Sequence, residues 1–174
     1  DSLALYNAGH AYRETLLTNI TDIYIDLGYN DINSVDAATT IARYTTLLDS
    51  LTAINPTARK HAVYIGLRTS SASGNWLPPP DQTPSANYVN TAGTRRYDVN
   101  AWLLTQVGTR LTTVLDCVPD YQYDAGANAD VYYSDGTNDD ITSDGAHFSQ
   151  DGEARVGYRG GLSVLYNHMV VNVI

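Results

Sequence analysis

The chain has 174 residues, 43% hydrophobic and 17% charged, a composition typical of one globular domain with a real core. Its net charge is −9, with 19 acidic residues against 10 Lys plus Arg, which argues against nucleic acid as a partner. No apolar run is long enough for membrane insertion, no signal-peptide pattern opens the chain, and the single cysteine excludes an intrachain disulfide and a thiolate metal cluster.

The first predicted elements are a strand and a helix. Residues 21–28 form a β-rich run that ends in Gly28, which predicts a strand followed by a turn. Residues 36–54 predict a helix that Ser34 or Asp36 can cap and that Asn55-Pro56 stops. Its apolar residues recur at helical spacing, at Ile41, Tyr44, Leu48, Leu51 and Ile54.

A second strand is expected over 61–67, and a long loop follows it. The stretch 70–94 is rich in Ser, Pro, Asn and Gly, so we expect no regular structure there. Loops of this length often carry function, which makes Trp76 and Tyr88 candidates for ligand contacts.

The second half of the chain repeats the alternation. A helix is expected over 95–111, with its apolar positions at Tyr97, Ala101, Leu104 and Leu111. A third strand over 113–118 contains Cys117, which we expect to be buried. A polar loop over 120–143 and a last helix from near Ser149 complete the pattern.

The order strand, helix, strand, helix, strand, helix predicts an α/β fold with a mostly parallel sheet and helices on both faces. In such sheets the working site lies at the carboxyl ends of the strands. The turn at Gly28 and the loops after Leu67 and Val118 are all expected to leave from that edge.

One candidate for chemistry is Ser143-Asp144-Gly145-Ala146-His147-Phe148-Ser149. A histidine that acts as a general base needs an acceptor that fixes its tautomer, and a carboxylate three residues earlier in a tight turn can supply it. Taken alone, Asp-x-x-His also fits an ordinary surface turn with an incidental histidine.

The other candidate is Gly28-Tyr29-Asn30-Asp31, directly after the first predicted strand. An amide N–H from Asn30 could point into a cleft and stabilise a developing oxyanion. Taken alone, these four residues also fit a plain turn.

Together, the two motifs resemble the SGNH (GDSL-like) hydrolase family over nearly the whole chain. Gly28-Tyr29-Asn30-Asp31 looks like the third conserved block of that family, Gly-x-Asn-Asp, and Asp144-Gly145-Ala146-His147 looks like its fifth, Asp-x-x-His. The resemblance implies a three-layer sandwich of flavodoxin-like type, formed by a single domain over 1–174 that lacks its first strand and helix.

Two further blocks of the family are matched less completely. Gly9, in Tyr6-Asn7-Ala8-Gly9, is similar to the glycine whose backbone N–H completes the oxyanion hole, and His10 beside it is either a site residue or a structural one. The family's nucleophile is a serine in a Gly-Asp-Ser turn. Asp1-Ser2-Leu3 looks like the remainder of such a turn, but Ser2 leaves no room for the usual helix and strand. We therefore expect the nucleophile in an N-terminal fragment or a larger parent protein.

The resemblance implies a serine esterase that acts on O-acylated polysaccharide or another small ester, with no cofactor or metal. His147 is the expected base, Asp144 orients it, and Asn30 and Gly9 bind the oxyanion. A likeness to carbohydrate deacetylases of bacteriophage tail proteins implies an extracellular or virion-associated location. The alternative is a catalytically incomplete module of the same fold, used for glycan binding or virion attachment. A flavodoxin-like cofactor domain is disfavoured, because no Gly-rich phosphate loop follows a strand.

Overall fold

The computed structural model describes residues 16–72, 81–118, 129–132, 141–142, 144–147 and 149. They fall into two compact units. The described residues of the first unit are 16–65 and 91–115, and those of the second lie within 66–90 and 116–149. The expectation of a single domain stays a prediction.

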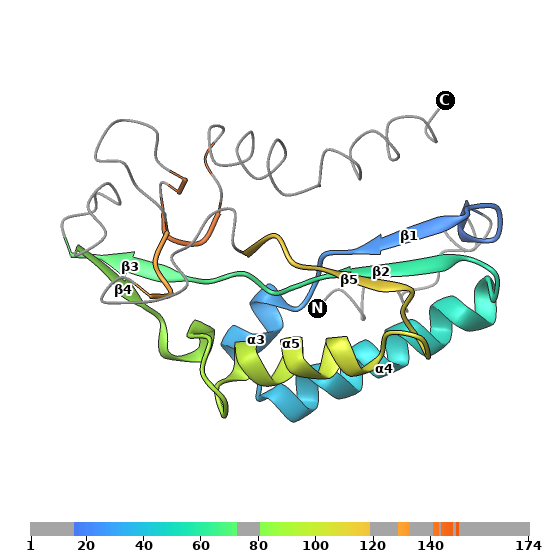
Figure 1. Ribbon diagram of the computed structural model, residues 1–174, viewed down its shortest axis with the longest axis horizontal. Coiled ribbons are helices and arrows are strands. Elements are labelled where there is room, and N and C mark those ends of the chain that lie inside the picture. The colour runs from blue at the N-terminus through green and yellow to red at the C-terminus, as the bar shows by residue number, and fades with distance from the viewer. Residues whose placement is uncertain are drawn as a thin grey trace. The chain divides into compact units, whose positions relative to one another are not determined.

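The first unit contains a parallel sheet with its described strands in the order β1–β2–β5 (Figure 1). Strand β1 covers Asp22–Ile25, β2 covers Arg59–Val63 and β5 covers Thr113–Leu115. Both pairings are parallel, which confirms the predicted α/β class with parallel strands. Strand β2 begins two residues before the predicted 61–67, and β5 is shorter than the predicted 113–118.

Three described helices belong to this unit: α3 (Tyr29–Ser34), α4 (Ala37–Ile54) and α5 (Arg95–Thr105). Helices α4 and α5 run side by side along one face of the sheet (Figure 1). Ile23 and Ile25 are the buried residues of β1, and they alternate with the more accessible Asp22 and Tyr24. This alternation gives β1 one buried face, whereas β2 buries three consecutive residues.

Helix α4 forms as predicted. The Asp36 side chain accepts the backbone N–H of Thr39 at 2.7 Å, so it caps the first turn. Tyr44, Leu48 and Leu51 are buried at helical spacing, and the N–H of Asn55 closes the last turn.

Helix α5 corrects the predicted apolar face. Its exposed large residues include Tyr97 and Leu104, whereas the buried ones are Arg96, Val99, Asn100 and Leu103. The polar members are buried because they satisfy the backbone just beyond β2. The Asn100 amide exchanges two hydrogen bonds with the N–H and C=O of Ile65, at 2.9 and 3.0 Å, and Arg96 Nε donates to the same carbonyl. The helix also ends at Thr105, before the predicted residue 111.

In the second unit, the expectation of no regular structure over 70–94 is wrong. Strand β3 (Thr69–Ser71) pairs antiparallel with β4 (Gln82–Pro84), and a short 3₁₀ helix, η2 (Ala86–Tyr88), follows. The Gln82 side chain accepts the N–H of Tyr132 at 3.0 Å and donates to its carbonyl at 3.2 Å, so one amide replaces a neighbouring strand.

Of the two aromatic residues expected to contact a ligand, Tyr88 does not face solvent, and the expectation for Trp76 stays a prediction. Tyr88 is 1% exposed and packs in the core, because η2 turns its side chain inward. Trp76 lies outside the described residues, as do most of the predicted 120–143 loop and all of the last predicted helix beyond Ser149. Cys117 is buried, as expected.

Candidate active site

The turn at residues 144–147 is tied to the second unit by backbone hydrogen bonds. The Ile141 carbonyl accepts the N–H of Ser149 at 2.9 Å, which brings the two sides of the turn together. The Gly145 carbonyl accepts the N–H of Thr69, from β3, also at 2.9 Å. Gly145 has φ 74°, in the left-handed region that glycine adopts readily, so its place in the motif has a conformational reason.

The buried hydroxyl of Thr142 forms hydrogen bonds with the backbone of this turn. Thr142 is fully buried, and its Oγ1 accepts the N–H of Gly145 at 2.9 Å. The same hydroxyl donates to the carbonyl of His147 at 2.7 Å. Thr142 therefore fixes both the middle and the end of the turn, a role that the sequence interpretation missed. The signal was present as a threonine two residues before the aspartate, because Ser and Thr often bond to nearby backbone groups.

Asp144 and His147 form the expected pair. Oδ1 of Asp144 accepts the backbone N–H groups of Ala146 and His147, each at 2.8 Å. Oδ2 lies 2.6 Å from the ring Nδ1 of His147. In the neutral imidazole this contact assigns the proton to Nδ1 and leaves the Nε2 lone pair to act as a base. The His147 side chain is 82% exposed, so its ring is accessible from solvent.

The electrostatics of the pair favour an ionised carboxylate. The hydrogen bond from the His147 ring, followed by the backbone N–H groups of His147 and Ala146, lowers the pKa of Asp144 to about 2. Asp144 therefore carries its charge throughout the pH range in which a histidine titrates. It can orient the ring and stabilise the imidazolium, as the acid of a Ser-His-Asp triad does.

Asn30 is the second residue of α3, so the alternative of a plain turn for this motif is wrong. It is exposed. Gly28 precedes the helix with φ 90°, and a Cβ built there would lie 2.9 Å from the Tyr44 ring. The neighbouring Asp31 pairs with Arg43 at 2.5 Å. The motif thus has a glycine for steric reasons and an aspartate for an ion pair, and Asn30 keeps an accessible amide.

The structure brings together Asp144 and His147 within the second unit, while Asn30 belongs to the first. The convergence of Asn30 and His147 on one cleft stays a prediction. Gly9, His10 and Ser2 lie outside the described residues.

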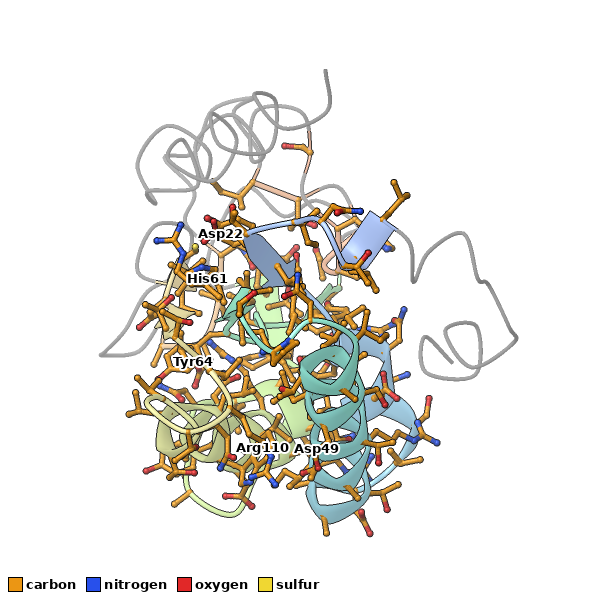
Figure 2. The ribbon with its side chains drawn as sticks, turned by 90° about the vertical axis from the view of Figure 1, so that its right-hand side faces the viewer. Asp22, Asp49, His61, Tyr64 and Arg110 are labelled. Carbon is orange, nitrogen blue, oxygen red and sulfur yellow. The ribbon has the colours of Figure 1, made fainter. Side chains whose placement is uncertain are left out.

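A second histidine network crosses the sheet of the first unit. The His61 ring bonds Asp22 Oδ1 through Nε2 at 2.9 Å and Thr113 Oγ1 through Nδ1 at 2.8 Å, and it stacks on Tyr24. Figure 2 shows Asp22 and His61 adjacent. The hydrogen bond from Arg59, followed by that from His61, lowers the pKa of Asp22 to about 2. Both ring nitrogens are engaged and the ring is largely buried, so this network joins β1, β2 and β5 and leaves no free base.

The described part of the first unit has a cavity of about 510 Å³, lined mainly by apolar residues of β1 and α4 and by Asp26. The cavity beside Gly28, Asp31, Arg43 and Tyr44, at about 30 Å³, has room for little more than a water molecule. Among the described residues, no group of three or more His, Cys, Asp or Glu side chains could hold a metal ion. No described helix combines the length and the hydropathy required to span a bilayer.

Comparison with known proteins supplies no relative: no protein-family model matches the chain, and no curated protein matches it with significance.

Proposed function

We propose that this chain forms most of an SGNH-type hydrolase domain, a serine esterase that removes acyl groups from O-acylated carbohydrate. The observation that supports the proposal is the Asp144–His147 pair, in which the carboxylate binds Nδ1 at 2.6 Å while Nε2 stays available. We also propose that the domain is a three-layer sandwich, in which the parallel sheet has helices on both faces.

The mechanism is acyl transfer in two steps. His147 Nε2 takes the proton of a serine hydroxyl, the serine oxygen bonds to the ester carbonyl carbon, and the sugar alkoxide leaves with that proton. Water then attacks the acyl-enzyme by the same route and releases the carboxylic acid. Asp144 stabilises the imidazolium in both steps, and the nucleophile is a serine outside the described residues.

The oxyanion of the tetrahedral intermediate needs donors fixed in advance. The Asn30 amide and the backbone N–H of Gly9 take this role, and one such donor is worth about 3 kcal/mol in other acyl-transfer enzymes. No metal or cofactor enters the reaction. The proposed setting is extracellular or virion-associated, on an acylated polysaccharide.

The test is hydrolysis of p-nitrophenyl acetate by the natural full-length protein, with a serine-reactive fluorophosphonate to label the nucleophile. His147→Ala should lower kcat by about 100-fold or more, as loss of a general base does. Asp144→Asn should also lower kcat, whereas Asp49→Asn, which removes an exposed carboxylate paired with Arg110, should not (Figure 2). If the protein binds glycan but shows neither turnover nor labelling, the esterase proposal is wrong, and the alternative of a module for glycan binding or virion attachment is favoured.

A further inference from the structure

We infer that Arg68 is the anion-binding residue of this site and that the substrate is an acidic polysaccharide, whose sugars carry carboxylates as well as ester groups. The inference rests on the proposed function and adds its substrate class.

Arg68 stands out among the cations of the described residues. Arg43, Arg59 and Arg110 pair with carboxylates, and the remaining ones donate to backbone carbonyls: Lys60 to Ala58, Arg95 to Ile32 and Arg96 to Ile65. Within the described structure, the Arg68 guanidinium alone has no acceptor. In a chain with 19 acidic residues against 10 Lys plus Arg, a cation left without a partner is unexpected on charge alone.

The acidic residues nearby already have other partners. In the described part of the second unit, Asp81 accepts from Ser71, Asp116 from the N–H of Val118 and Asp130 from the N–H of Asn90. Asp144 is bound to His147. The unit therefore holds a half-buried arginine, and the forked donors of its guanidinium are suited to a planar oxyanion.

The backbone on both sides of Arg68 is fixed next to the catalytic turn. Its carbonyl accepts the N–H of Ser85 at 2.8 Å, and the next N–H, from Thr69, binds the Gly145 carbonyl at 2.9 Å. Leu67 and Thr69 on either side are buried, so the backbone at Arg68 is held in place. Chain geometry through these contacts limits the Cα atoms of Arg68 and His147 to at most about 15 Å apart. An arginine and a histidine at that separation can engage neighbouring units of one oligosaccharide.

A carboxylate on the polymer is the occupant that these observations favour. An arginine in the same unit as the base can hold a charged sugar unit while a neighbouring ester reaches His147, which adds binding energy remote from the reacting bond. Because the chain carries a net charge of −9, it repels acidic polymers at long range, and a local guanidinium contact is needed to hold one.

The experiment compares two acetylated polymers, acetylated polygalacturonate (acidic) and acetylated xylan (neutral), with p-nitrophenyl acetate as a third substrate. The natural full-length protein and its Arg68→Gln variant are assayed at about 0.15 M salt, where exposed charges interact over about 8 Å. We expect Arg68→Gln to raise KM for the acidic polymer about tenfold, the usual size of a lost hydrogen bond to a charged group. Rates on the neutral polymer and on p-nitrophenyl acetate should change less than twofold.

Arg68→Lys should bind the acidic polymer more tightly than Arg68→Gln but less tightly than the parent protein. Lysine keeps the positive charge but lacks the two parallel N–H donors of the guanidinium. The matched control is Arg110→Gln, which removes an arginine from an exposed ion pair of the first unit and should leave all three substrates unaffected. Equal losses on the acidic and neutral polymers, or no loss on either, would overturn the assignment of Arg68.

A binding measurement separates this inference from the proposed function. If no substrate is turned over, the esterase proposal fails, and calorimetric titration with unacetylated polygalacturonate still tests Arg68. Binding that Arg68→Gln weakens about tenfold, with unchanged urea unfolding, supports the anion site. Absence of binding, or binding that the variant leaves unchanged, refutes it.

Discussion

The side chain of Asp144 makes three contacts with the turn that it begins, and two of them are to His147. One carboxylate oxygen accepts a hydrogen bond from the backbone N–H of His147, and the other accepts one from the ring Nδ1 of the same residue. The backbone contact fixes the position of the histidine backbone, and the ring contact fixes the orientation of its imidazole. The contacts within the pair therefore come from four consecutive residues, and Thr142 and Thr69 hold the backbone of that turn.

Removing the Thr142 hydroxyl should loosen this pair. Thr142→Val keeps the shape and deprives the N–H of Gly145 and the carbonyl of His147 of a partner, at a cost of about 1–3 kcal/mol of unfolding free energy. Thr142 is a positioning residue, so kcat on p-nitrophenyl acetate should fall more than KM changes. Urea unfolding and steady-state kinetics measure the two effects. Thr142→Ser keeps the hydroxyl and should restore kcat; equal kcat in both variants would contradict the role.

Acid should weaken the second unit through Asp144. Its pKa is lowered to about 2 from an ordinary value of 3.8, so its contribution to stability is fully present above about pH 4. That contribution is lost as the pH falls from about 4 to about 2. The carboxylate is half exposed, so the effect is expected to be small. NMR titration of the Asp144 carboxyl checks the shift directly, and His147→Ala should move the pKa back toward 3.8.

Local patterns predicted the parts of the fold that local interactions determine. Helix α4 needed only its apolar spacing, the Asp36 cap and the Asn55 stop, all of which lie in one continuous segment. The Asp144–His147 pair was predictable for the same reason, since both partners lie in one turn.

The sequence patterns misassigned the buried face of α5 and missed α3, and in both places the structure depends on long-range hydrogen bonds. The periodicity of α5 favoured Tyr97 and Leu104 as buried residues, yet the helix buries Arg96 and Asn100 because the backbone of Ile65, more than thirty residues earlier, needs partners. Helix α3 was not predicted either. Its carbonyl at Ile32 is bound by Arg95, a contact that the motif around Asn30 does not reveal.

Gly28→Ala should destabilise the first unit for two reasons that a control can separate. The new Cβ would lie 2.9 Å from the Tyr44 ring and 3.0 Å from Ile65, and the residue has φ 90°. We expect a loss of about 2–4 kcal/mol in urea unfolding, from strain and overpacking together. Gly93→Ala shares a φ of 89° and has nothing within 4 Å of the new Cβ, so it should cost only the strain, about 1 kcal/mol. Equal losses would show that the Tyr44 contact does not matter.

The last prediction concerns Asn55, whose side chain joins the end of α4 to the segment before β1. Its Nδ2 donates to the carbonyls of Leu17 and Ile20 at 2.8 and 2.9 Å, and its Oδ1 accepts the N–H of Ala58 at 3.0 Å. Asn55→Ala leaves the buried N–H of Ala58 and the two part-buried carbonyls without this partner and should lower the unfolding free energy by about 2–3 kcal/mol. Pro56→Ala, at an exposed neighbouring position, should cost much less.

Asn55→Asp tests the direction of those bonds. The carboxylate keeps the acceptor for Ala58 but points its second oxygen at two carbonyls, which should raise its pKa in the folded protein above the unfolded value. A raised pKa means that the variant binds a proton more tightly when folded, so its stability relative to the parent should rise as the pH falls from about 7 to about 4. The protonated acid can again donate to one of the carbonyls. A difference in unfolding free energy that stays constant over this pH range would show that the side chain at position 55 does not face the carbonyls of Leu17 and Ile20.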